Sequence, residues 1–101
     1  MIRRLSMLIP LAIASVAVAA PIRYQAPPET AVLAAGPDVE LAEAICSSCH
    51  SLDYITTQPP MGPQAPAFWA AAVRKMQTAY GSEISKEDAD KIVAYLGAAY
   101  R

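Results

Sequence analysis

The sequence predicts an all-α domain. Three segments, at about 37–49, 66–80 and 86–96, repeat apolar side chains every three or four residues, which is the spacing of one helix face. No segment alternates apolar and polar residues in the way that a half-buried strand does. The chain has 101 residues, which suits one small domain. We therefore expect about three helices in a single domain, joined by loops.

The first expected helix begins at Pro37, because proline lacks the amide hydrogen that the first helical position leaves unused. Asp38 suits the first turn, where the helix dipole favours negative charge. The apolar face carries Leu41, Ala42, Ile45 and Cys49. Residues 51–65 follow as an expected loop, because three prolines there remove backbone donors and restrict φ.

The second expected helix begins at Pro66 and ends before Gly81. Its apolar stripe consists of Trp69, Ala72, Val73, Met76 and Tyr80. The third expected helix has a capping box, with Ser85 at its start and Asp88 three residues later. Its apolar stripe consists of Ala89, Ile92, Val93 and Leu96. Three short helices make a thin core, so an apolar cofactor at the centre would add stability.

The first 36 residues differ in composition from the helical part. Residues 1–19 are expected to be a cleaved secretory signal peptide, with Arg3 and Arg4 before an uncharged apolar run that ends in small residues. A retained membrane anchor is the alternative, but the run is shorter than the roughly 20 residues of a spanning helix and contains Pro10. Residues 20–36 contain several prolines and are expected to be an extended arm, loosely held or docked on a partner.

The charge balance argues against a nucleic-acid partner. Removal of Arg3 and Arg4 with the signal peptide would leave six basic residues against nine acidic ones. A nucleic-acid-binding domain would instead carry a basic excess.

The chemistry of the chain centres on Cys46-Ser47-Ser48-Cys49-His50. C-x-x-C-H is the attachment signature of haem c. On a helix, residues three positions apart lie on one face, so both thiols could bond the two vinyl groups on one haem edge. His50 would then be the proximal ligand of the iron. Cys46 and Cys49 are thus expected to hold one covalent haem c.

Three other interpretations explain less of this motif. A zinc site normally has four protein ligands, and the chain has two cysteines and one histidine. A thioredoxin-like redox pair requires a βαβ setting, which the sequence does not predict. A disulfide in a metal-free module would close a very short loop, stabilise little and leave His50 unexplained.

The sixth iron ligand is expected to be a methionine. His50 is the only histidine, and the methionines outside the signal peptide are Met61 and Met76. Met76 shares the apolar stripe of the second helix, whereas Met61 lies in the proline-rich loop eleven residues after His50. We favour Met76 as the distal ligand and keep Met61 as the alternative.

Two aromatic residues are further candidates for the site. Trp69 and Tyr54 could pack on the haem or donate a hydrogen bond to a propionate, although ordinary core packing explains each of them equally well. With the histidine and both cysteines used, no catalytic triad or nucleophile–base pair remains. The sequence therefore indicates an electron-transfer protein rather than an enzyme.

Several segments together resemble a known family. They are Cys46-Ser-Ser-Cys-His-Ser-Leu-Asp-Tyr-Ile55, Trp69-x-x-x-Val73-x-Lys75-Met76, Tyr80-Gly81-x-x-Ile84 and Ile92-x-x-Tyr95-Leu96. This series resembles the small monohaem cytochrome c subunit of periplasmic sulfite dehydrogenases, over roughly residues 33–100.

The resemblance implies a class I cytochrome c domain over residues 37–101, located in the periplasm. It also implies a heterodimer, in which a molybdenum-containing subunit oxidises sulfite and this chain takes the electrons one at a time. A soluble cytochrome c would then accept them. The resemblance assigns haem attachment to Cys46 and Cys49 and iron ligation to His50 and Met76.

Two other functions remain open at this stage. One is a stand-alone periplasmic monohaem cytochrome c that serves another dehydrogenase. The other is a haem enzyme or gas-binding protein, which would need an open sixth position on the iron.

Overall fold

A computed structural model of the protein describes residues 20–101, which form helices and no strands. The elements are α1 (Val39–Cys46), α2 (Asp53–Thr56), the 3₁₀ helix η1 (Gly62–Gln64), α3 (Ala65–Ala79) and α4 (Lys86–Ala99). The predicted all-α class is therefore confirmed for this part of the chain. The predicted signal peptide, residues 1–19, lies outside the described residues. Within residues 20–101 no helix is long and apolar enough to cross a membrane.

Helix α1 is shorter than the sequence predicts. It begins at Val39 because Asp38 has φ of 62°, a left-handed conformation that cannot belong to the helix. It ends at Cys46, and the side-chain hydroxyl of Ser48 donates a hydrogen bond of 2.7 Å to the carbonyl of Ile45. Such local bonds compete with helix propagation. As a result Cys49 lies in the turn after α1 and not on the helix itself.

The expectation of a loop over 51–65, and hence of three helices, is wrong in part. One turn of α-helix, α2, forms directly after the C-x-x-C-H motif, because Leu52 and Ile55 bury their side chains there, with 4% and 2% exposed. The 3₁₀ turn η1 tolerates Pro63 near its start, where the first amide groups have no helical partner. The chain thus has four α-helices in residues 20–101.

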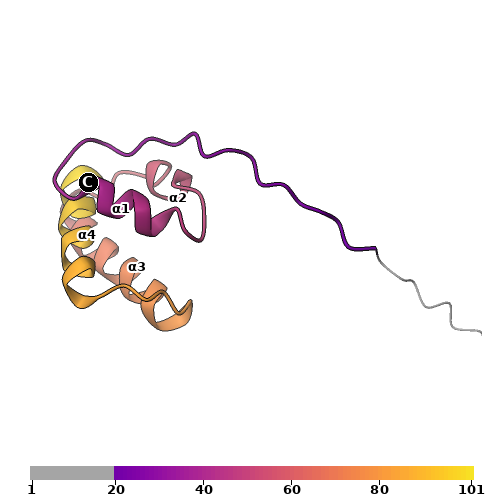
Figure 1. Ribbon diagram of the computed structural model, residues 1–101. Coiled ribbons are helices and arrows are strands. Elements are labelled where there is room, and N and C mark those ends of the chain that lie inside the picture. Colours follow the sequence, from indigo (N-terminus) through magenta and orange to yellow (C-terminus); the bar gives the residue numbers. More distant parts are fainter. Residues whose placement is uncertain (1–19) are drawn as a thin grey trace, which may run out of the picture.

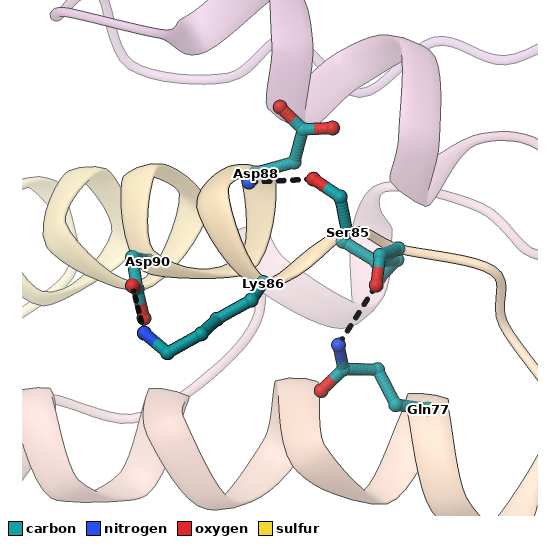
Figure 2. A network of polar contacts seen from close by, with 6 residues as sticks. Gln77, Ser85, Lys86, Asp88 and Asp90 are labelled. Carbon is teal, nitrogen blue, oxygen red and sulfur yellow. Dashed lines mark hydrogen bonds and ion pairs between the residues drawn. The ribbon is translucent and has the colours of Figure 1, made fainter.

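The turn between α3 and α4 is held by side chains (Figure 2). The hydroxyl of Ser85 accepts a hydrogen bond of 3.0 Å from the amide of Asp88, which confirms the predicted cap of the last helix. Gln77 of α3 donates from Nε2 to the carbonyl of Ile84, at 2.9 Å. These contacts tie the turn to both helices. Lys86 and Asp90 form only an exposed ion pair, which adds little stability.

Replacing Ser85 with alanine is expected to lower the free energy of unfolding by about 1 kcal/mol, because the Asp88 amide would lose its partner. Chemical denaturation followed by circular dichroism measures the change. Ser47→Ala is a matched control, since Ser47 is also an exposed serine but does not cap a helix start. An equal effect in both variants would contradict the role of Ser85 as a cap.

Helix α4 joins the two sides of the domain. It packs against α3 and against α1, whereas α1 and α3 do not approach each other closely anywhere in residues 20–101. In Figure 1, α1 and α2 lie above, α3 lies below, and α4 runs along the left side of the domain from one to the other. The most deeply buried large side chains, Trp69, Ile92 and Leu96, come from α3 and α4. This arrangement leaves room between α1 and α3.

Residues 20–36 have no helix or strand, and the second half of this arm docks on the chain's own domain. Leu33 is 5% exposed, and the hydroxyl of Tyr95 donates a hydrogen bond of 2.6 Å to the carbonyl of Ala34. The amide of Ala34 donates to the hydroxyl of Tyr100 at 2.8 Å. Burial raises the pKa of Tyr95, so its hydroxyl stays protonated and able to donate. Residues 20–28 are exposed and extended (Figure 1).

Candidate functional site

A cavity of about 610 Å³ lies between α1, α3 and α4. Its volume falls within the range of about 300–1,000 Å³ that is usual for small-molecule and cofactor sites. The predicted site residues in its wall are Cys46, Cys49, His50, Tyr54, Trp69 and Met76. Residues that are buried in the core also line it, namely Ile55, Trp69, Val73, Ile92 and Leu96. The cavity wall and the hydrophobic core are therefore largely the same set of side chains.

The two cysteines differ in environment although both line the cavity. Cys46 ends α1 and is partly buried, while Cys49 lies in the following turn and is exposed. Both are free thiols. Burial raises the pKa of the Cys46 thiol, because the apolar surroundings disfavour the thiolate. The structure thus brings both cysteines to the same cavity, although only Cys46 belongs to the helix itself.

We expect Cys49 to react several-fold faster than Cys46 with iodoacetamide when the chain carries no haem. The thiolate is the reactive species, and Cys46 combines lower exposure with a raised pKa. Mass spectrometry of the alkylated peptides over time, at mildly alkaline pH, measures both rates. Equal rates in the folded chain, with the denatured chain as the reference, would contradict the difference in burial.

His50 is held in one tautomer by its neighbour. Its Nδ1 lies 2.9 Å from the carbonyl oxygen of Ser51, and a carbonyl can only accept, so Nδ1 carries the proton. In the neutral ring Nε2 then keeps its lone pair, and this is the form that binds a metal. The ring also contacts Tyr54 edge to face, with 5.8 Å between ring centroids. His50 is exposed and lines the cavity, so it is able to reach a bound ligand.

The two candidate methionines lie in different places. Met76 lines the cavity, on the stripe of α3 that also carries Trp69 and Val73. Met61 precedes η1 and packs against the core from outside the cavity. The backbone of Met76 is fixed by the next turn, because its carbonyl accepts a hydrogen bond of 3.0 Å from the amide of Ser82. Gly81 permits that turn with φ of 69°.

The two aromatic candidates, Trp69 and Tyr54, differ in whether their polar atoms are already hydrogen-bonded within the fold. The indole N–H of Trp69 donates to the carbonyl of Tyr100 at 3.1 Å, so this donor is already used within the fold. Trp69 therefore offers the cavity an apolar ring rather than a hydrogen bond to a propionate. Tyr54 is 43% exposed and lines the cavity. Of these two side chains, Tyr54 is therefore the one whose polar group could hydrogen-bond to a propionate.

The structure adds cavity residues that the sequence analysis did not single out for the site. Ser82 and Ile84 come from the turn between α3 and α4, and Ser51 directly follows His50. For Ile92 and Leu96 the apolar stripe of the last helix predicts burial, and this stripe is the one sequence signal that points toward the cavity. Glu29 accepts hydrogen bonds from Ser51 and Leu52, and no local sequence pattern indicates that contact.

The cavity and its donors fit a haem. The lining is mostly apolar, as a macrocycle requires, and it includes both cysteines, His50 and Met76. No group of three or more His, Cys, Asp or Glu side chains within residues 20–101 could hold a metal ion alone. A haem iron takes most of its ligands from the porphyrin and needs only one or two from the protein.

Comparison of the chain with models of known protein families finds no match, and comparison with curated proteins finds no significant one.

Proposed function

We propose that this protein is an electron-transfer cytochrome c subunit with one covalent haem c. The observation that carries the proposal is the C-x-x-C-H motif in the wall of an apolar cavity of about 610 Å³ that also receives Met76. A motif match alone is weak support for a function. A match whose thiols, imidazole and a methionine face one cavity of suitable size is much more specific.

Different side chains would attach the haem covalently and ligate its iron. Cys46 and Cys49 would hold it covalently through thioether bonds, and His50 and Met76 would be the axial ligands. When bound, the haem supplies a centre that gains and loses one electron at its iron. The apolar residues of α3 and α4 would exclude water, and the Ser51 carbonyl would keep His50 in the ligating tautomer. The chain itself has no catalytic role in this proposal.

The proposed context is a periplasmic complex. By resemblance, a molybdenum-containing subunit would oxidise sulfite and pass electrons singly to this chain in a heterodimer. A soluble cytochrome c would receive them. An isolated cytochrome that serves another dehydrogenase would use the same haem site, so the partner requires its own test.

Haem attachment is tested by expressing the full chain with haem-maturation machinery. The purified protein is expected to gain the mass of one haem and to give the pyridine haemochrome spectrum of haem bound through two thioethers. Replacing both cysteines with alanine should abolish covalent haem, whereas Ser47→Ala should retain it. A colourless unsubstituted protein would overturn the proposal. Rapid carbon monoxide binding by the reduced protein would show an open sixth position and favour the gas-binding alternative.

The partner is tested by purification of the protein from its native host. A co-purifying molybdenum subunit that reduces this haem on addition of sulfite is the expected result. A haem that stays oxidised with sulfite and the neighbouring dehydrogenase present would remove the sulfite assignment and leave the haem assignment intact.

A further inference from the structure

Glu29 connects the N-terminal arm to the segment that follows the haem-binding motif. Its Oε1 accepts hydrogen bonds from the amides of Thr30 at 3.0 Å and Ala31 at 2.9 Å, which fold the arm around the carboxylate. The same oxygen lies 3.3 Å from the hydroxyl of Ser51, and Oε2 accepts from the amide of Leu52 at 2.8 Å. One carboxylate thus meets four donors, two from residues 30–31 and two from residues 51–52.

The bonded segment carries the partner of the imidazole. Ser51 follows His50 directly, and its carbonyl oxygen lies 2.9 Å from Nδ1 of His50. Leu52, whose amide donates to Glu29, directly precedes α2 and has a buried side chain, with 4% exposed. That amide precedes the helix and has no partner within it, so the carboxylate satisfies a donor that would otherwise lack one. Glu29 and the buried Leu52 together fix the peptide unit that contains the Ser51 carbonyl.

We propose that Glu29 is a positioning residue for the proximal side of the haem site, which acts through Ser51 and Leu52 on the hydrogen bond to His50 Nδ1. The inference rests on the proposed ligation of haem iron by His50. It makes the docked part of the arm a component of the redox site rather than a linker.

A hydrogen bond from Nδ1 to a carbonyl raises the basicity of a ligating imidazole, which favours the ferric over the ferrous iron. Loss of Glu29 would free the Ser51–Leu52 peptide unit and weaken that bond. The midpoint potential should then rise. Hydrogen bonds from the Leu52 amide, which has the largest effect, and from the Ala31 amide, the Ser51 hydroxyl and the Thr30 amide lower the pKa of Glu29. The carboxylate is therefore ionised at neutral pH and accepts at both oxygens.

The test compares three variants of the full chain with its haem attached. Glu29→Gln removes the charge and replaces one acceptor oxygen with an NH₂ group, which cannot accept a hydrogen bond from the donors that now bond to Glu29. Glu29→Asp keeps the charge but is one methylene too short to span from the arm to Leu52. Glu40→Gln is the control, because Glu40 is an exposed carboxylate on α1 and its change in charge is the same. The midpoint potential is measured by spectroelectrochemistry, and exchange of the Leu52 amide is measured by hydrogen–deuterium exchange.

Both Glu29 variants are expected to have a higher midpoint potential, which corresponds to a several-fold larger equilibrium constant for reduction. The Leu52 amide should exchange its hydrogen about tenfold faster or more in both variants. The control should change neither. Potentials equal to that of the control would overturn the positioning role while the haem assignment stands. A shift in Glu29→Gln but not in Glu29→Asp would also overturn it, since charge alone would explain the shift. Absence of haem from the unsubstituted protein would overturn the proposed function and this inference together.

Discussion

Replacing Trp69 with alanine is expected to lower the free energy of unfolding by about 3–5 kcal/mol, the usual effect of deleting a buried aromatic side chain. Trp69 is 1% exposed and contacts the rings of Phe68 and Tyr100 edge to face. Its N–H also holds the carbonyl of Tyr100 at the end of α4. The truncation would therefore loosen α3 from α4 and remove part of the cavity wall.

The effect is large for a domain of this size. Total stabilities of about 5–15 kcal/mol are usual, so the variant would lose a large part of the available stability. Thermal unfolding followed by circular dichroism should show Tm lower by about 10 °C or more. The matched variant is Trp69→Phe, which keeps much of the ring volume but not the N–H. Its free energy of unfolding should fall clearly less than that of Trp69→Ala. A loss below about 1 kcal/mol for Trp69→Ala would contradict its place in the core.

Replacing Met76 with alanine in the haem-loaded protein is expected to abolish the weak far-red band of thioether–ferric ligation. The midpoint potential should fall, because a thioether ligand favours the ferrous iron. The reduced protein should also gain rapid carbon monoxide binding at the position that Met76 vacates. Visible absorption spectra and potentiometry of the purified variant measure all three changes.

Met61→Ala is the matched control for Met76→Ala. Met61 lies outside the cavity wall, so the far-red band should survive its replacement, with only a modest loss of packing against the core. A band that survives Met76→Ala and disappears in Met61→Ala would reverse the ligand assignment. Such a result would require the loop before η1 to reach into the cavity.

The overlap of core and cavity would give the proposed haem a part in the stability of the domain. Val73, Ile92 and Leu96 belong to the buried core and also face the cavity. A small domain buries too little apolar surface to be very stable without further help. On the proposed function, a haem between α1 and α3 would complete the core that these side chains begin, so ligand binding and folding would be coupled.

Much of the fold follows from the sequence alone. Regular spacing of apolar residues predicts α3 and α4 closely, since periodicity within one segment is a local property, and the bond from Asp88 to Ser85 confirms the predicted cap. The same stripe places Trp69 and Met76 on one face, and both line the cavity. The C-x-x-C-H motif likewise brings two thiols and an imidazole together because its residues are adjacent.

Only the tertiary structure decided the contacts between distant segments. The carboxylate of Glu29 meets Leu52, and Tyr95 and Tyr100 hold Ala34, across separations that no local pattern encodes. Packing also decided that α2 forms in a segment rich in turn residues, because burial of Leu52 and Ile55 outweighs weak helix propensity. Packing also decided that the N–H of Trp69 donates to the carbonyl of Tyr100 at the end of α4. The sequence alone determined which side chains are available for the proposed haem, because the motif and the apolar stripes are local. The fold decided which of these side chains share one cavity and which contacts hold them in place.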